Sequence, residues 1–255
     1  MLEEYLPKVI ASLVLIAFAM LFSMLNRLRL GKDILGASLR AIVQMSILSL
    51  VIGFIFSLKG LFYTFLLLCF MSIAGAFISR RRARGLPGAL SVSLLGIFLG
   101  AFPVLIFMVA STALEAKPMV VLPLGGMAIG NSMNAISLGL NRLRGEVKKS
   151  KDTIEAILSL GLPPSVAIET AAKESIRAAM IPRLDNIRSL GLVWIPGLMA
   201  GSLLGGQSPI RAAVYQLAIM FIILASSIIA SSVAVKIESR RLFTEAAQLR
   251  TIKYE

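Results

Sequence analysis

Long apolar runs are the feature that most limits what this chain can fold into. A run of about 20 apolar residues is the length that a helix needs to cross the hydrocarbon core of a bilayer. Backbone groups in lipid are paired only within helices or closed barrels, and runs of this length predict helices. The runs lie approximately at residues 6–25, 35–58, 61–79, 89–110, 118–140, 190–204 and 212–235. We therefore expect an all-α, polytopic protein of the cell (inner) membrane, with about seven transmembrane helices in one domain over residues 1–255.

The composition agrees with this expectation. Of the 255 residues, 57% are apolar and only 15% are charged, whereas a soluble domain usually holds about a quarter charged residues. The net charge of +13 would favour a nucleic-acid partner in a soluble protein, but Lys and Arg also collect on the cytoplasmic side of membrane proteins. We therefore expect the lipid bilayer, and no nucleic acid, as the partner of this surface.

The loops between the runs differ sharply in basic residues. One alternate set of loops and ends carries 22 Lys and Arg residues, and the other set carries four. The rich set is predicted to be cytoplasmic, which places the N-terminus outside and the C-terminus inside. The 190–204 run is the weakest of the seven, because it is short and contains Pro196-Gly197.

Residue types that carry catalysis or ion coupling are scarce. The chain has no histidine, and its one cysteine, Cys69, lies in an apolar run. All 13 acidic residues fall in loops, at the ends or in the polar stretch between the fifth and sixth runs. Proton-coupled transporters relay protons through buried Asp, Glu or His, and hydrolases pair a nucleophile with a base. We expect neither an enzyme nor a proton-coupled transporter, so energy for transport should come from a partner.

The fifth run carries amide groups that a lipid-facing helix has no reason to hold. Amide side chains at membrane depth need partners, so they should face other helices or a polar path. Helical spacing puts one set of residues on one stripe and a second set on the neighbouring stripe. The first set is Gly130, Asn134, Ser137 and Asn141, and the second includes Met127 and Asn131.

Two interpretations of these stripes remain open. The asparagines could hydrogen-bond across helices in a packing seam, with Gly126 and Gly130 permitting close approach. Alternatively, they could line a translocation path or a dimer seam. Met127 and Met133 could offer soft contacts to a metal, but methionine is usually core filler. The metal ligands, if any, stay unknown at this stage.

Polar residues in the second and seventh runs add to the candidate path or packing core. Arg40 and Gln44 lie four residues apart on one face. Arg40 could snorkel to lipid phosphates or contact the fifth run, whereas Gln44 lies deeper and needs a partner in the bundle. Tyr215 and Gln216 place polar groups near the outer end of the seventh run, where Tyr215 could be only an interfacial anchor.

The sixth run combines a break with small residues. Gly197, Gly201 and Gly205 follow Pro196 at intervals of four. This pattern predicts a kinked helix with a small-residue packing face. It suits either a moving gate or static close packing.

The stretch 142–189 is too long for a simple connection. Residues 151–160 predict a helix that ends at Gly161, and Pro163-Pro164 opens a second helix over 166–180, which Pro182 should end. The apolar residues of both recur at helical spacing. We expect amphipathic cytoplasmic helices that lie on the membrane surface or dock to a partner, with a solvated hairpin as the alternative.

Part of this stretch resembles a known motif. Residues 155–161, EAILSLG, resemble the EAA-x-x-x-G pattern of ABC-transporter permeases, with isoleucine in place of the second alanine. In those proteins this loop forms a coupling helix that sits in a groove of the ATPase subunit. The resemblance therefore implies that Glu155, Ala156, Leu158 and Gly161 contact an ATPase.

Several further runs of sequence occur in the order of one family. They are RAIVQM at 40–45, GMAIGNSMN at 126–134, GLVWIPGLMAG at 191–201 and YQ at 215–216. Together with the coupling motif they resemble the FetB-type permease family, also called YbbM-like, which includes bacterial iron exporters and plant aluminium-tolerance membrane subunits. The resemblance covers about residues 40–220. It implies a homodimer that pairs with a separately encoded cytoplasmic ABC ATPase.

The function expected from the sequence is therefore the membrane-spanning permease subunit of an ABC exporter, with metal ions such as iron as the leading cargo. The chain has no Walker A motif, so ATP is expected to bind to the partner and no cofactor to this chain. Three alternatives remain open: an ATPase-independent channel or facilitator, an exporter of an organic solute, and a membrane scaffold without a path.

Overall fold

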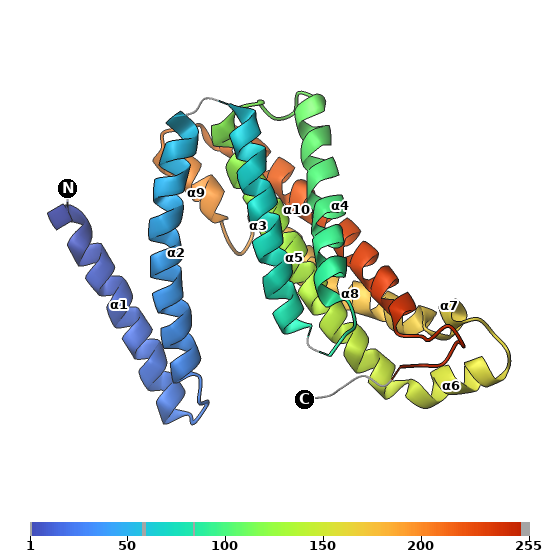
Figure 1. The fold of residues 1–255 in the computed structure, drawn as a ribbon. Helices are drawn as coiled ribbons and strands as arrows, with labels where there is room; N and C mark the ends of the chain where they lie inside the picture. Colours follow the sequence, from blue (N-terminus) through green and yellow to red (C-terminus); the bar gives the residue numbers. More distant parts are fainter. Residues whose placement is uncertain (1, 58–59, 84, 251–255) are drawn as a thin grey trace. The chain divides into compact units, whose positions relative to one another are not determined.

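The computed structural model describes residues 2–57, 60–83 and 85–250, and these residues form ten helices without any extended strand (Figure 1). The all-α prediction is confirmed. Five of the helices are long and apolar enough to cross a bilayer, and residues 9–25 form a shorter apolar helical stretch. The chain divides into two units, residues 1–59 and residues 60–255.

The first unit is a helical hairpin of α1 (Leu2–Leu25) and α2 (Gly31–Ser57). Its turn contains Arg27 and Arg29, which both have a positive φ, and the backbone N–H of Leu30 donates to the buried Ser23 hydroxyl over 3.1 Å. Most of the apolar side chains on both helices are exposed, such as Leu50 at 76%. Exposed apolar surface over whole helices is what a lipid environment covers.

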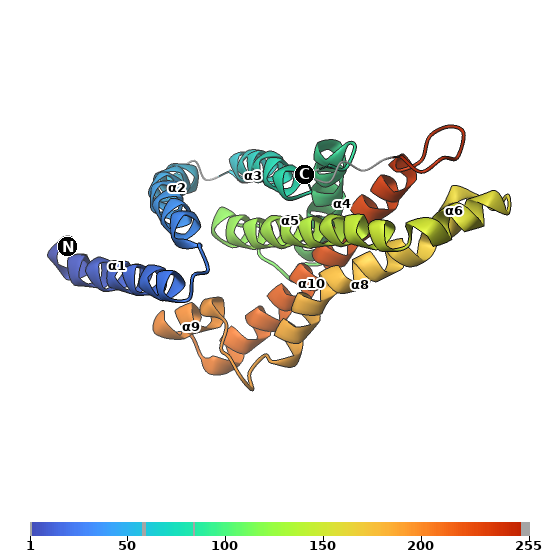
Figure 2. The ribbon, with the colours of Figure 1, turned by 90° about the horizontal axis from the view of Figure 1, so that it is seen from below.

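The second unit holds eight helices, five of which form its core. The eight are α3 (Leu61–Arg82), α4 (Ala89–Ala110), α5 (Pro118–Lys149), α6 (Lys151–Ser159), α7 (Pro164–Ala167), α8 (Glu169–Arg188), α9 (Gly197–Leu204) and α10 (Pro209–Arg241). Helix α10 packs against α4, α5, α8 and α9, while α3 packs against α4 and α5. Figure 2 shows α8 lying beside both α5 and α10.

Helices α4 and α10 approach each other closely through small residues. A Cβ built on Gly100 would lie 2.6 Å from both the Ala230 Cβ and the Ser226 carbonyl oxygen, and one on Gly96 would lie 2.9 Å from the Ala230 carbonyl oxygen. Small residues four apart let two helix backbones touch. The GIFLG sequence at 96–100 meets a matching small stripe on α10, which continues to Ala234.

Of the two glycines expected to permit close approach on the fifth run, Gly126 lies against another helix and Gly130 does not. A Cβ on Gly125 would lie 2.7 Å from Leu68 on α3, and one on Gly126 would lie 3.2 Å from Met71. No described atom outside the local helix lies within 4 Å of such a Cβ on Gly130. The close approach of α3 therefore occurs one turn earlier than the Gly130 stripe predicts.

The helices α5 and α10 are longer than the apolar runs that predicted them. At 1.5 Å per residue, their 32 and 33 residues span about 50 Å, which exceeds the ~30 Å hydrocarbon core. The expected end of the fifth helix near Leu140 therefore corresponds to a change in composition, and the backbone hydrogen bonding continues to Lys149.

The first half of the stretch 142–189 forms as predicted. Gly161 follows α6 with a φ of 80°, and the N–H groups of Gly161 and Leu162 donate to Leu158 and Ile157. This is the Schellman pattern that ends helices. The second predicted helix divides into α7 and α8, and Pro182 lies inside α8 and does not end it.

The structure does not confirm a seventh transmembrane helix at 190–204. Helix α9 has eight residues, or about 12 Å of rise, and the residues before it form a tight turn. Gly191 has a φ of 75°, and its N–H donates to the Trp194 carbonyl oxygen. Neither Gly197 nor Gly201 would bring a Cβ within 4 Å of another described element, so the expected packing face is open.

We predict opposite effects for two glycine substitutions. Gly100→Ala should lower the stability of the purified protein by about 1–3 kcal/mol, because the new methyl group overlaps α10. Gly130→Ala should leave stability unchanged or raise it by about 0.5–1 kcal/mol, because alanine favours the helix and the space is open. Unfolding of both variants in detergent micelles measures the difference, and equal stabilities would contradict the α4–α10 contact.

Candidate functional site

Helices α5, α8 and α10 of the second unit pack together at one end and separate toward the other end. A Cβ on Gly139 of α5 would lie 3.0 Å from Val235 of α10 and 3.6 Å from Ala179 of α8. Earlier residues of α5 and α10, and later residues of α8, surround a common cavity. These pairings make α5 and α10 parallel and α8 antiparallel to both.

The cavity has a volume of about 460 Å³, which is within the range of small-molecule sites. It lies level with residues 127–131, the middle of the fifth apolar run. Its polar lining comes from all three helices, and the loop before α9 closes one side. The lining residues are Met127, Asn131, Arg183, Asn186, Ile187, Trp194, Pro196, Gly197, Leu198, Gln216, Ile219, Met220, Ile223 and Leu224.

Two polar groups at this cavity are buried without partners. Gln216 is only 4% exposed, and its Oε1 accepts no hydrogen bond within residues 85–250 or the other described ranges. The Nε of the half-buried Arg183 likewise has no acceptor in the described structure. Burial without a partner costs free energy, so neither of these two atoms stabilises the fold through a hydrogen bond to the described residues. The amide nitrogen of Asn131, by contrast, donates to the Met127 carbonyl oxygen over 2.8 Å.

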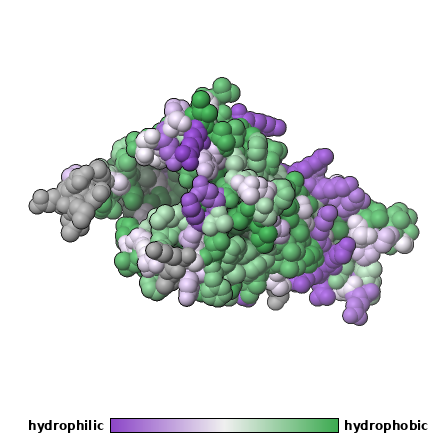
Figure 3. Space-filling view, turned by 90° about the horizontal axis from the view of Figure 1, so that it is seen from above, coloured by the Kyte–Doolittle hydropathy of each residue, from purple (hydrophilic) through white to green (hydrophobic). Residues whose placement is uncertain are grey.

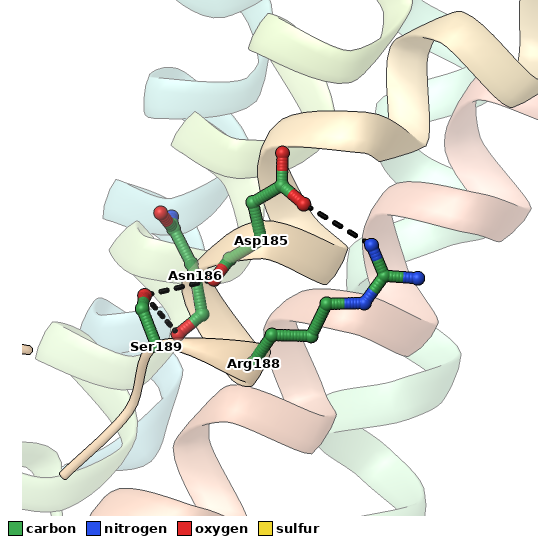
Figure 4. A network of polar contacts seen from close by, with 4 residues as sticks. All are labelled: Asp185, Asn186, Arg188 and Ser189. Atoms are coloured by element: carbon green, nitrogen blue, oxygen red, sulfur yellow. Dashed lines mark hydrogen bonds and ion pairs between the residues drawn. The ribbon is translucent and has the colours of Figure 1, made fainter. Parts of the chain in front are cut away.

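The cavity wall before α9 is held by a small polar network at the end of α8 (Figure 4). The Ser189 hydroxyl donates to the Asp185 carbonyl oxygen over 2.8 Å and accepts from the Trp194 indole over 3.0 Å. Arg188 pairs with the Asp185 carboxylate at 3.3 Å. This network fixes Trp194 and the turn before Pro196 against the end of α8.

A second cavity of about 280 Å³ lies at the beginning of α5 and α10. It shares the lining residues Leu198 and Ile219 with the first cavity, so the two cavities are neighbours. Tyr215 lines it, and the Arg211 guanidinium lies 5.9 Å from the tyrosine ring. Together the cavities extend from the middle of α5 to its N-terminal end.

The stripe of α5 that carries Asn134 and Ser137 packs against α3. The Arg82 guanidinium donates to Asn134 Oδ1 over 2.9 Å, and the hydroxyl groups of Ser79, Ser93 and Ser137 form a buried cluster with oxygen separations of 3.0 and 3.2 Å. Asn141 is exposed. The fifth run therefore serves both interpretations: Asn131 faces a cavity, and Asn134 belongs to a packing seam.

Some predicted residues belong to other parts of the structure. Arg40 and Gln44 are exposed on α2, and no hydrogen bond or ion pair to either is found in the described residues. Gly201 lies on α9 outside the cavity lining. Met133 packs against α3, where its Cβ lies 3.7 Å from the position that a Cβ on Gly75 would take. Of the two methionines, only Met127 therefore lines the cavity.

The predicted coupling residues gather at the far end of the second unit. Glu155, Leu158 and Gly161 line a groove of about 750 Å³ together with residues 246–249, and Ala156 lies exposed outside this lining. Leu160 is 79% exposed at the tip. Figure 3 shows hydrophilic surface gathered at the end that carries α6–α8, whereas much of the remaining visible surface is hydrophobic.

Sequence reasoning missed several residues of these sites. Arg183 and Asn186 lie beyond Pro182, which was expected to end a helix, and Trp194 lies in the 190–204 run, so none of the three was predicted as a site residue. Because α8 continues to Arg188, Arg183 and Asn186 share one helix face. Glu238 was counted as an end residue. It is fully buried in α10, and neither carboxylate oxygen has a hydrogen-bond donor in the described part of the chain.

The structure offers little support for a metal held by this chain alone. Within the described residues there is no group of three or more His, Cys, Asp or Glu side chains that could hold an ion. The cavity presents two thioethers, from Met127 and Met220, together with amides and one guanidinium.

Apolar helices of spanning length and a polar cavity between them define a multi-pass helical membrane protein. The chain belongs to the family described as Uncharacterised protein family (UPF0014), whose model matches residues 6–243. It is 34% identical to "Probable iron export permease protein FetB" of Escherichia coli (strain K12), over 93% of this chain and 92% of the relative. The resemblance found in the sequence is confirmed.

Plant proteins are also similar over nearly the whole chain. "UPF0014 membrane protein STAR2" of Oryza sativa subsp. japonica is 29% identical, over 95% of this chain and 85% of the relative. "Protein ALUMINUM SENSITIVE 3" of Arabidopsis thaliana is 28% identical, over 94% and 88%. No solved structure matches this chain.

We predict that Arg82 and Asn134 stabilise the fold as a pair. A double-mutant cycle with Arg82→Met and Asn134→Leu should give a coupling energy of about 0.5–1.5 kcal/mol, because each single change removes the same hydrogen bond. Arg81→Met, at the same end of α3, is the matched control and should show no coupling to Asn134. Additive effects of the pair in micelle unfolding experiments would contradict this contact.

Proposed function

We propose that this chain is the membrane-spanning permease subunit of an ABC exporter driven by a separate cytoplasmic ATPase. One observation carries the proposal: the helices that line the polar cavity continue to the tip that carries the coupling motif. Helix α5 runs without a break from the cavity to residue 149, and α8 returns from the tip to the cavity. The relative from E. coli that is named a permease supports the same class.

The proposed orientation keeps the N-terminus outside and the C-terminus inside. Because α5 and α10 are parallel, the chain must return across the membrane between them. We assign this return to α8, the turn at 189–196 and α9 taken together, so a short α9 does not change the side on which α10 ends. Most of the 22 basic residues of one loop set then face the cytoplasm, whereas Arg183 lies at the cavity on the returning helix α8.

Coupling is proposed to begin at α6 and α7. An ATPase bound there would contact Glu155, Leu158 and the exposed Leu160, while Ala156 and Gly161 shape the turn. ATP-driven closure of two ATPase subunits on a homodimer of this chain would displace the tips of α5 and α8. The cavity between them would then alternate between inward-open and outward-open states.

Metal ions such as iron are the cargo that the name of the relative from E. coli suggests. An organic solute fits the amide-lined cavity as well. An ATPase-independent channel or facilitator is the competing class, and co-purification separates the two. The tagged chain is expressed together with its genomic neighbours and purified. If no ABC ATPase is retained with it, an ATPase-independent channel or facilitator explains the function better.

Glu155→Lys should uncouple the ATPase. We expect stimulation of ATP hydrolysis by the permease in proteoliposomes to fall about tenfold or more, because the reversed charge opposes docking by more than about 1.4 kcal/mol. Glu174→Lys on α8 is the matched control, since Glu174 is an exposed acidic residue outside the groove. Unchanged ATP hydrolysis with Glu155→Lys would refute coupling through α6.

Asn131→Leu should reduce export of iron from loaded proteoliposomes, because it removes an amide from the cavity wall. Asn134→Leu should retain most of the transport, since Asn134 contacts Arg82 and does not line the cavity. Monodisperse elution of both variants shows that they are folded. If folded Asn131→Leu transports as well as the parent protein, the path does not pass this cavity.

A further inference from the structure

The most unusual group in the cavity is a cation without a counter-charge. Arg183 is the one charged residue among the described residues that line it. No ion pair or hydrogen bond to Arg183 is present in residues 85–250 or the other described ranges, and its Nε is buried. The nearby Asp185 is engaged by Arg188 at 3.3 Å and does not line the cavity (Figure 4).

A half-buried charge of this kind favours a partner. Removing part of a guanidinium from water costs free energy unless an opposite charge or hydrogen-bond acceptors replace the water. The planar guanidinium fork matches the two oxygens of a carboxylate or phosphate and can bind both at once. The cavity is therefore equipped for an oxyanion, whereas a free metal cation would be repelled by Arg183.

Gln216 adds a second requirement. Its side chain is 4% exposed and lines the same cavity, and its buried Oε1 lacks a donor within the described structure. A carbonyl oxygen accepts hydrogen bonds and does not donate them. A ligand that satisfies Gln216 must carry a donor such as a hydroxyl group. Asn131 and Asn186 provide further amide groups on the cavity wall.

We propose that this cavity binds a small oxyanion that also carries a hydroxyl group, with Arg183 as the anchor and Gln216 as the acceptor of the hydroxyl. Two sources share this chemistry: a soluble hydroxycarboxylate, free or as a metal chelate, and the phosphate and glycerol hydroxyls of a lipid headgroup. The identification of this occupant as cargo rests on the proposed permease function, whereas binding itself does not.

Calorimetry with citrate tests the anchor. The full chain in neutral detergent micelles should bind citrate, and Arg183→Met should weaken binding about tenfold or more, because a charge-assisted hydrogen bond is lost. Arg177→Met, six residues earlier on the same helix, exposed and outside the lining, should bind as the parent does. Equal citrate affinity in parent and Arg183→Met proteins would overturn the assignment.

A stability measurement separates this role from a structural one. Arg183→Met without citrate should unfold at the same temperature as the parent or higher, because the charge has no partner to lose. Citrate should then raise the unfolding temperature of the parent protein and not that of Arg183→Met. A less stable Arg183→Met variant that still responds to citrate would show that Arg183 is structural and overturn the proposal.

Tricarballylate, which is citrate without its hydroxyl group, tests the second requirement. The parent should bind citrate about tenfold or more tightly than tricarballylate, because the analogue leaves Gln216 without a donor. Gln216→Leu should remove this preference. If parent and Gln216→Leu proteins discriminate equally between the two acids, Gln216 does not read the hydroxyl.

Nanodiscs distinguish the two sources. If the occupant is soluble, citrate should bind equally in phosphatidylcholine and phosphatidylglycerol discs. If it is a headgroup, phosphatidylglycerol should compete with citrate and remain attached in native mass spectra of the parent, and Arg183→Met should lose it. Absence of both citrate binding and retained phosphatidylglycerol would overturn the proposal. Loss of ATPase coupling in Glu155→Lys is measured independently, so either idea can fail alone.

Discussion

The backbone contact between α4 and α10 is the constraint on which the second unit depends. Gly96 and Gly100 permit it, since any side chain there would overlap Ala230 or the Ser226 carbonyl. Lipid gives little hydrophobic drive for helix association, so close packing of small residues has to supply it. With α10 fixed against α4, its other faces are free to contact α5, α8 and α9. The cavity exists because α5, α8 and α10 are held together at one end and separate at the other.

The sequence was most informative where composition decides the outcome. Apolar length correctly predicts the long helices, and Gly161 correctly marks the end of α6. It predicted a span at 190–204 from apolar character alone, and the structure does not confirm this span, since Gly191 and Pro196 build a turn before the short helix α9. It also missed Arg183, because a charge in a polar stretch looks solvated until the fold brings α8 back beside α5. Partners across 50 residues, such as Arg82 and Asn134, leave no local pattern to read.

The cavity changes the chemistry expected of the cargo. A metal-binding protein would be expected to present carboxylates, imidazoles or thiolates, and the described lining has none of these. It offers a guanidinium, three amides, two thioethers and an apolar wall. A metal carried through such a site would travel inside an anionic chelate, whose ligands come from the solute. This reconciles a relative named for iron export with a chain that is poor in metal ligands.

Helix α5 is a single helix of 32 residues. A displacement at one end of such a helix therefore also moves its other end. Its length of about 48 Å places the polar cavity and the tip on opposite sides of the Gly139 contact. A tilt of ~5° about Gly139 would move the N-terminal end of α5 by roughly 2.7 Å and its C-terminal end by roughly 1.3 Å in opposite directions. Since Gly139 holds the helix against Val235 and Ala179, that contact is a natural fulcrum. A small push at the tip would then widen or narrow the cavity without bending any helix.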